Sequence, residues 1–313
     1  MTEPRLHLVG DTTASLFAPF IDSWTIALEA ENKSRATITG YTISMRDFIR
    51  WIDTTHGATE PTETTTALIR AWLADQLVKN SPATARSRWV GMKSFCKWMT
   101  LEGEIAVNPM STIEPPSVPE KPAEMLTLEQ TSALIKGCEG PLLVDRRDVA
   151  LMTFFPDTGC RLGGVAGLML ADLSLRDREA RVVEKGNKER IVPFGANTAR
   201  ALDRYLRLRG RQPNAHLPNV WLSGKDGRAM TKNAIQQMFR RRGRAILKIE
   251  NCHPHMMRHL WADTLLKDSD MKEGDVQVLG GWSSRQMLGR YAAKTRSERA
   301  REAYRGRSPM DKL

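Results

Sequence analysis

The stretch ARVVEKGNKERIVP, residues 180–193 of this 313-residue chain, has the sequence pattern of two β-strands joined by a turn. Residues 180–184 alternate between apolar and polar side chains, residues 185–188 (KGNK) have the composition of a turn, and residues 190–193 are again typical of extended chain. Such a pattern predicts an antiparallel β-hairpin. Elsewhere apolar residues recur at spacings of three and four, which indicates amphipathic helices. The sequence therefore predicts a mainly α fold with a small antiparallel sheet.

Helices are expected on both sides of this hairpin. Thr127 is a favourable N-cap residue and Gln130 occupies the capping-box position three residues later, so a helix should begin there. The other helices expected in this part of the chain cover residues 145–158, 197–208, 232–247, 255–267 and 275–279. Together with the hairpin they predict a mixed α/β domain that is mostly helical.

A proline-rich segment separates this domain from the N-terminal part of the chain. Residues 108–122 contain five prolines, which cannot lie inside a helix and which favour extended, semi-stiff chain. We therefore expect a linker between an N-terminal domain of residues 1–107 and a second domain of residues 123–313. Apolar periodicity predicts four helices in the first domain, around Phe17–Leu28, Thr37–Ile52, Leu68–Val78 and Thr84–Met99.

The net charge of +11 is unevenly distributed along the chain. Residues 1–120 hold 11 Lys and Arg against 14 Asp and Glu, whereas residues 121–313 hold 36 against 22. A basic excess in one part of a chain favours a polyanionic partner such as nucleic acid, although a merely soluble basic surface has the same composition. The residues expected to contact DNA are the cluster Arg240, Arg241, Arg242 and Arg244, and Arg86, Lys93 and Lys97 on a face of the fourth helix.

Composition and cysteine spacing argue against several classes of protein. No apolar run approaches the roughly 18 residues that a membrane span needs. Residues 1–11 lack the basic and then apolar layout of a signal peptide, so a cytoplasmic location without a membrane partner is expected. The four cysteines are scattered without a CxxC pair, which argues against a disulfide framework and against a zinc site.

Three basic residues of the second domain are candidate phosphate ligands. Arg161 lies in TGCRLG, residues 158–163, where the glycines let the backbone approach a ligand closely. Arg258 follows His255 by one helical turn, so both lie on one helix face, and Lys185 is at the hairpin tip. Guanidinium groups bind phosphate in a planar, bidentate way, and a lysine flanked by cations becomes a better proton donor as its pKa falls. These spacings alone do not define a mechanism.

The order of these segments resembles the tyrosine recombinases, the family of phage integrases and of the Xer and Cre recombinases. The resemblance covers nearly the whole chain and rests on five motifs in the family's order, namely TGCRLG at 158–163, KGNKERIVP at 185–193, HPHMMRH at 253–259, LGGW at 279–282 and Tyr291 nine residues after Trp282. For the fold it implies an N-terminal four-helix SAM-like core-binding domain, which contacts DNA, and a catalytic domain with a C-terminal tail.

The resemblance also implies how a phosphodiester would be attacked. Arg161 and Arg258 match the two arginines that clamp the scissile phosphate, and Tyr291 matches the nucleophile that forms a 3′-phosphotyrosine intermediate. This intermediate conserves the bond energy, so strands can be exchanged without ATP, and no metal or other cofactor is expected.

Proton transfer is assigned from the same resemblance. Lys185 matches the hairpin lysine that protonates the leaving 5′ oxygen, whereas the nearby Lys188 fits a contact to backbone or to DNA phosphate. His255 matches the histidine that assists proton removal from the nucleophile. Trp282 stands where many relatives have a second histidine, and its indole N–H can still donate to a phosphate oxygen.

The function implied is that of a site-specific recombinase or integrase of a phage or another mobile element, which cleaves and rejoins double-stranded DNA. A homotetramer on two duplexes is expected, in which the basic tail of residues 294–313 passes to a neighbouring protomer, and a directionality factor is a further candidate partner. Two alternatives stay open at this point. One is DNA relaxation of the type IB topoisomerase kind, and the other is a catalytically weak DNA-binding regulator.

One position departs from the family's pattern. Relatives usually carry an acidic residue three places after the first arginine, where this chain has Gly164. The carboxylate helps to hold the basic residues of the site, so its absence puts catalytic efficiency in question. Asp157 and Asp172 are the candidate replacements that the sequence offers.

Overall fold

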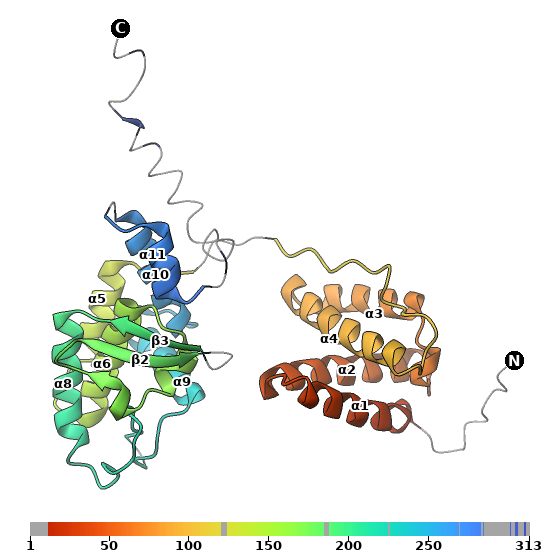
Figure 1. The fold of residues 1–313 in the computed structure, drawn as a ribbon, viewed down its shortest axis with the longest axis horizontal. Helices are drawn as coiled ribbons and strands as arrows, with labels where there is room; N and C mark the ends of the chain where they lie inside the picture. The colour runs from red at the N-terminus through yellow and green to blue at the C-terminus, as the bar shows by residue number, and fades with distance from the viewer. Residues whose placement is uncertain are drawn as a thin grey trace, which may run out of the picture. The chain divides into compact units, whose positions relative to one another are not determined.

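Two units make up the chain in the computed structural model, Met1–Lys121 and Pro122–Leu313 (Figure 1). The structure describes residues 12–119, 124–184, 188–224, 226–268, 270–282 and 284, together with 301, 304, 305 and 310. Within these residues, no helix combines the length and the apolar character that crossing a membrane requires.

The first unit is helical. Its elements are α1 (Thr13–Ala30), α2 (Arg35–His56), the short 3-10 helix η1 (Pro61–Glu63), α3 (Thr66–Lys79) and α4 (Pro82–Leu101). The side chains of Ser34, Thr65 and Ser81 cap α2, α3 and α4 by accepting a hydrogen bond from the backbone N–H three residues later. The prediction of four helices in this part of the chain is confirmed.

Aromatic side chains fill the core between these helices. The rings of Trp24 and Phe95 meet edge to face at a centroid distance of 5.2 Å, as do those of Phe48 and Trp72. All four side chains are buried. Such pairs favour a defined packing beyond the area that they remove from water, so α1, α2, α3 and α4 are held in one arrangement.

The start of the proline-rich segment packs onto this helical unit. Met110 and Ile113 are buried in its core. The indole N–H of Trp89 donates to the carbonyl oxygen of Ile113 at 3.0 Å, and the hydroxyl of Thr66 donates to that of Pro109 at 2.9 Å. Residues 108–113, which the sequence places in a linker, are therefore anchored to the first unit, although none of the described residues 108–119 forms a helix or strand.

The second unit surrounds a central helix with further helices and a sheet. Its elements are α5 (Leu128–Gly137), α6 (Leu143–Thr158), α7 (Leu162–Ala166), the 3-10 helix η2 (Leu170–Asp172), β1 (Leu173–Ser174), β2 (Glu179–Glu184), β3 (Lys188–Pro193), α8 (Ala196–Arg209), α9 (Lys232–Arg242), the π-helical turn η3 (Gly243–Leu247), α10 (Pro254–Lys267) and α11 (Glu273–Gly280). Helix α6 contacts α5, α8 and α10, and half of its sixteen residues are buried. The mainly α fold with a small antiparallel sheet is confirmed.

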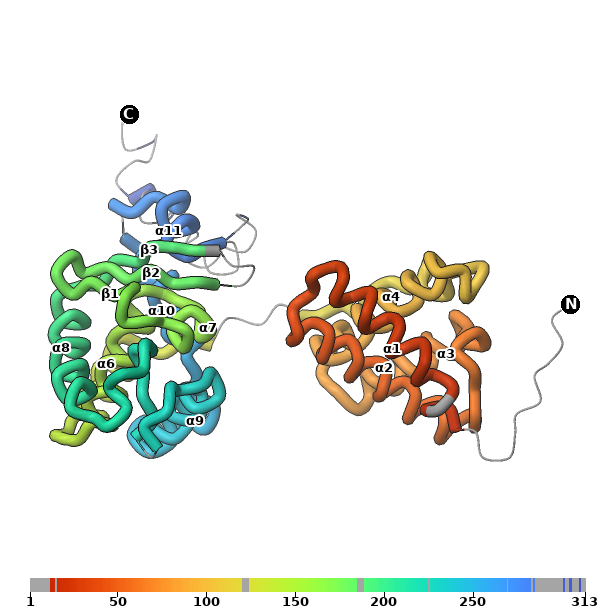
Figure 2. Tube along the Cα trace, turned by 60° about the horizontal axis from the view of Figure 1, so that its bottom comes forward, coloured from red at the N-terminus to blue at the C-terminus, as the bar shows by residue number. Residues whose placement is uncertain are grey.

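The sheet has the order β1-β2-β3 and is antiparallel throughout (Figure 2). In its hairpin Val182 pairs with Arg190 and Glu184 with Lys188. Helix α7 packs against β2 and α11 packs against β3, so the hairpin lies between these two short helices. The expected capping box of Thr127 and Gln130 is present at the start of α5.

A buried ionic cluster ties α6 to α9. Asp148 is fully buried and accepts hydrogen bonds from Arg147 at 2.6 Å and from Arg242 at 2.8 Å, while Arg242 also pairs with Asp145 at 3.2 Å. Arg147 donates further to the carbonyl oxygen of Leu222 at 3.0 Å. Because buried charges are costly unless they are paired, this cluster is sensitive to the loss of any member.

We expect Asp148→Asn to destabilise the second unit by about 3 kcal/mol or more, because Arg147 and Arg242 then lose their shared counter-charge. Hydrogen exchange of the α6 amides measures this loss within the intact chain. The matched control is Asp203→Asn, which breaks an exposed i,i+4 pair with Arg207 and should cost about 0.5 kcal/mol or less. Equal losses in the two variants would contradict the role given to the cluster.

Candidate active site

Arg161 is presented by a tight turn at the end of α6. Gly159 ends this helix in the left-handed conformation, with φ of 59°. A Cβ atom at this position would collide with the ring of Trp261, so both the backbone conformation and the packing require glycine. The chain then passes the buried Cys160 and enters α7, with Arg161 as its N-cap residue.

The Arg161 guanidinium is held on two sides. Its Nη1 pairs with Oε2 of Glu184, and its Nη2 donates to the carbonyl oxygen of Gly281 at 3.2 Å. The backbone N–H of Arg161 also donates to Oε1 of Glu184 at 3.4 Å. The side chain remains 34% exposed, so an anionic ligand can still reach it.

Arg258 is the buried counterpart of Arg161. It lies in the second turn of α10, is 1% exposed, and donates to the carbonyl oxygens of Gly159 and, at 2.6 Å, Gly280. Its guanidinium carbon lies 4.5 Å from the ring centroid of Trp282, in a cation–π arrangement. Because Gly280 and Gly281 receive Arg258 and Arg161 respectively, both predicted phosphate ligands converge on the end of α11.

Trp282 serves mainly as a packing residue in this structure. Its ring is 6% exposed and lies 5.8 Å from that of Trp261, besides covering Arg258. A Cβ atom at Gly280 would collide with it, which explains the glycine at that position. Donation from its indole N–H to a phosphate oxygen stays a prediction.

His255 lies in the first turn of α10, beside Arg161. Both residues line a cavity of about 310 Å³, together with Cys160, Gln236 and His253. The His255 ring meets that of His259 edge to face at 4.3 Å. Partial desolvation, and then the positive charges of Arg258 and Arg161, lower the pKa of His255 below its ordinary value of 6.5. The imidazole is therefore mostly neutral at pH 7 and can accept a proton.

Glu184 is the acidic neighbour of Arg161 that the sequence analysis missed. Its side chain is 7% exposed and lies between two arginines, pairing with Arg161 and, at 2.8 Å, with Nη2 of Arg190. Burial alone would raise the pKa of Glu184, but the guanidinium groups of Arg190 and Arg161 outweigh it, so the pKa lies below its ordinary value of 4.5. The available signal was an acidic residue directly before Lys185 in a chain that lacks one at Gly164.

The two carboxylates expected to replace the missing one have other partners. Asp157 accepts a hydrogen bond from the backbone N–H of Gly195 at 2.7 Å, and Asp172 accepts from Nε of Arg181 at 2.9 Å. That expectation was wrong, because Asp157 lies at the end of α6 facing the start of α8 and Asp172 is used within the sheet region.

The structure does not describe the predicted nucleophile or the predicted general acid. Tyr291 and Lys185 lie outside the described residues, as does the side chain of Lys188. Among the other tyrosines, Tyr205 is fully buried and donates its hydroxyl to the carbonyl oxygen of Val220 at 3.0 Å, which leaves it inaccessible to DNA. Tyr41 stacks on Trp24 in the first unit.

Most of the predicted DNA-contacting residues are exposed. Arg86, Lys93 and Lys97 are spaced seven and four residues apart on α4, which places them on one helix face. Arg240, Arg241 and Arg244 line a separate hollow of about 820 Å³ with Lys248 and Glu250.

Arg242 departs from that expectation. Its side chain is 21% exposed and is held by Asp145 and Asp148. The structure therefore gives Arg242 a role in joining α9 to α6, instead of a place in the exposed basic cluster.

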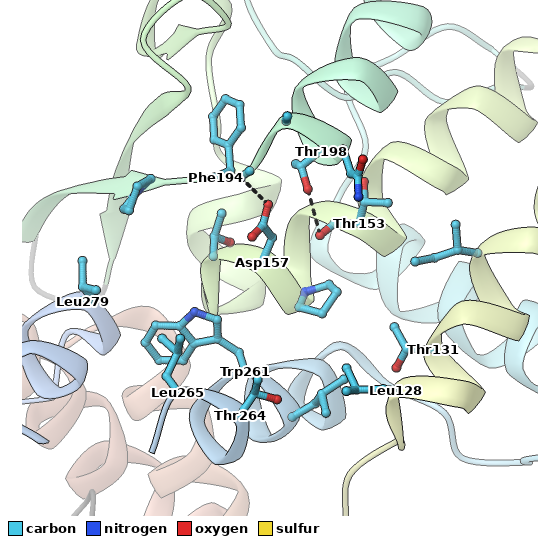
Figure 3. A pocket seen from close by; sticks show the side chains of 18 of the residues that line it. Leu128, Thr131, Thr153, Asp157, Phe194, Thr198, Trp261, Thr264, Leu265 and Leu279 are labelled. Carbon is cyan, nitrogen blue, oxygen red and sulfur yellow. Dashed lines mark hydrogen bonds between the residues drawn. The ribbon is translucent and has the colours of Figure 1, made fainter. Parts of the chain in front are cut away.

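A third, more apolar cavity of about 720 Å³ lies among α5, α6, α10 and α11 and the start of α8 (Figure 3). Its walls include Leu128, Phe194, Trp261, Leu265 and Leu279. In Figure 3 the labelled side chains of Trp261 and Leu265 line one side, and the hydrogen-bonded Asp157 lies on the other. This cavity contains none of the residues predicted to act on phosphate.

The chain is similar to known proteins over most of its length. The model of the phage integrase family matches residues 124–298. A tyrosine recombinase XerC of Xanthomonas campestris pv. campestris is 26% identical over 273 residues, which cover 87% of this chain and 82% of that protein. A XerC of Actinobacillus pleuropneumoniae is 31% identical over 196 residues, 62% of each chain.

Two solved structures share the fold. The XerH site-specific recombinase bound to a palindromic difH substrate has a TM-score of 0.73 at 16% identity and covers 95% of this chain and 85% of its own. A lambda integrase dimer bound to a COC′ core site has a TM-score of 0.69 at 17% identity and covers 88% of this chain and 76% of its own.

Fold, site and comparisons together define a DNA strand-transferring enzyme of the tyrosine recombinase class. The chain belongs to the phage integrase family, whose model matches more than half of its residues. It is a site-specific recombinase, and DNA is its partner. The expectation of a site-specific recombinase is thereby confirmed.

We expect the histidines of α10 to titrate below the ordinary range in the free protein. Nuclear magnetic resonance titration should give His255 a midpoint below 6.5 and His259 one at about 4, where desolvation and then His255 are the main causes. Because the unfolded chain binds a proton at about 6.5, stability falls as the pH is lowered from 6.5 towards 4. His255→Gln and His259→Gln assign the resonances, and a His255 midpoint at or above 6.5 would refute the environment described.

Proposed function

We propose that this recombinase cleaves DNA with the set Arg161, Lys185, His255, Arg258, Trp282 and Tyr291. The observation that carries the proposal is the convergence of the Arg161 and Arg258 guanidinium groups on the end of α11, beside the cavity that His255 lines. Two guanidinium groups and a neutral imidazole at one place suit the binding of a phosphate and the removal of a proton next to it.

The chemistry follows from these groups. A phenol with a pKa of about 10 is a poor nucleophile at neutral pH, so Tyr291 needs a base and nearby cations. In the proposed step His255 takes the phenolic proton, the Tyr291 oxygen bonds to phosphorus, and the bond from phosphorus to the 5′ oxygen breaks. Lys185 donates a proton to that oxygen, while Arg161 and Arg258 stabilise the negative charge of the phosphorane-like transition state.

The test is a DNA duplex with a nick near the cleavage site, which traps the covalent intermediate. Tyr291→Phe should lower adduct formation by several orders of magnitude, because only the attacking oxygen is removed. DNA affinity should remain nearly unchanged. Tyr41→Phe is the matched control and should form the adduct normally.

The outcome also separates this proposal from its alternatives. An adduct formed by Tyr291→Phe would refute the nucleophile and make Tyr304 the next candidate. Transfer of a strand between two duplexes by the unmodified protein supports recombination, whereas supercoil relaxation without transfer would contradict it.

We infer further that the enzyme works in the cytosol as a homotetramer on two duplexes, on sites in phage or other mobile DNA and with a directionality factor. One similar solved structure is a transposon integrase in complex with circular-intermediate DNA, at 19% identity and a TM-score of 0.66. The apolar cavity of Figure 3 supports the assembly, since it can receive an apolar helix face from another protomer. Ala300, Ala303 and Tyr304 recur at helical spacing in the tail of residues 294–313 and would supply such a face.

Deletion of residues 298–313 should therefore leave single-site binding intact and abolish strand exchange between two sites. Leu265→Glu, which places a charge in the wall of the cavity, should reproduce this loss. Val278→Glu is the matched control, because Val278 is exposed and does not line the cavity. Recombination at the full rate by the truncated protein would show that the tail does not couple the protomers.

A further inference from the structure

Gly164 of α7 faces the strand that carries Glu184. A Cβ atom built at Gly164 would lie 3.4 Å from Cβ of Val182 and 3.6 Å from Cγ of Glu184, both ordinary contact distances. A side chain at residue 164 would thus extend towards the space that Glu184 occupies. The absence of one leaves the Glu184 side chain room to reach Arg161.

The Glu184 carboxylate uses both of its oxygens on arginines. Oε2 pairs with Nη1 of Arg161, while Oε1 accepts from Nη2 of Arg190 at 2.8 Å and from the backbone N–H of Arg161 at 3.4 Å. One carboxylate therefore joins the N-cap of α7 to both strands of the hairpin. Since it is 7% exposed, water screens these pairs little.

We propose that Glu184 is the positioning residue of the active site and that its carboxylate performs, from β2, the task for which residue 164 has no side chain. The inference rests on the proposed role of Arg161 in binding the scissile phosphate. It assigns Glu184 no contact with DNA, because both of its oxygens already face arginines.

The physical basis is that one carboxylate, that of Glu184, pairs with two guanidinium groups, those of Arg161 and Arg190. Without Glu184, the positive charges of Arg161 and Arg190 would repel each other. Of the acceptors described for the Arg161 guanidinium, the carbonyl oxygen of Gly281 would then remain. Glu184 also directly precedes Lys185 in the chain. The carboxylate therefore sets the spacing between the phosphate-binding arginine and the strand end from which the proposed general acid extends.

The same geometry predicts the effect of moving the carboxylate. Gly164→Glu alone places a second carboxylate against Glu184, so the two repel each other and disturb Arg161. Gly164→Glu combined with Glu184→Gly returns one carboxylate to the same space from the opposite wall. If Glu184 acted only by filling volume, moving its carboxylate to residue 164 would not restore cleavage.

The experiment uses the full chain and the nicked duplex, and it measures the single-turnover rate of adduct formation, the DNA affinity and the thermal midpoint. Glu184→Gln should slow adduct formation by about 10–100-fold, because Arg161 loses the charged partner that orients it, with DNA affinity nearly unchanged. Gly164→Glu should also slow it, and the double variant Gly164→Glu/Glu184→Gly should be faster than either of its single variants. Glu189→Gln, which removes an exposed carboxylate on β3 3.6 Å from Arg181, is the matched control and should cleave normally.

Each outcome decides between two readings. If Glu184→Gln cleaves at the wild-type rate while Arg161→Ala is inactive, the positioning role is refuted and the proposed function stands. If Arg161→Ala cleaves normally, the proposed function itself fails. Should Glu184→Gln not fold, the double variant decides: recovered cleavage supports the proposal, and a folded double variant without recovery overturns it.

Discussion

The buried guanidinium of Arg258 holds together the two backbone segments on which the site is built. It donates to Gly159 at the end of α6 and to Gly280 at the end of α11. Carbonyl oxygens at helix C-termini carry the negative end of the helix dipole and lack partners within the helix, so a cation suits both. Because Arg161 follows Gly159 by two residues and donates to Gly281, this one anchor also locates the exposed arginine. The ring of Trp282 then covers Arg258 and limits its access to water.

The second unit uses much of its basic charge internally. Arg147 and Arg242 neutralise Asp148, Arg209 donates to the carbonyl oxygens of the loop after α8, and Arg258 joins two helix ends. A buried ion pair contributes less to stability than its Coulomb energy suggests, because both charges lose their hydration, but removing one partner is strongly destabilising. The net charge of the second unit therefore overstates how much positive charge is exposed to DNA. The exposed guanidinium groups of α9 and η3 are the better guide to a phosphate contact.

Sequence patterns predicted the helices and strands well where a few neighbouring residues determine the structure. The capping box of Thr127 and Gln130 placed the start of α5, and apolar spacing placed α6, α8 and α10. Helix α7 was missed because its five residues are too few for a helical period to emerge. The helix expected over residues 232–247 ends in a π-helical turn after Arg242, since Gly243 packs directly against Cys252. The prolines of residues 108–122 predicted an extended linker, but the apolar side chains of Met110 and Ile113 are buried in the core of the first unit.

The sequence by itself determined the class of enzyme and the order of its motifs, because these properties reside in residue type and spacing along the chain. Only the tertiary structure decided which charges meet. Glu184 lies 23 residues from Arg161, and Asp148 lies 94 residues from Arg242, so no local period links the partners. Electrostatic pairing depends on distance and desolvation, and both are set by the packing of α7 on β2 and of α9 near α6. For this reason the sequence showed that residue 164 carries no carboxylate, whereas the fold showed the pairing of Glu184 with Arg161.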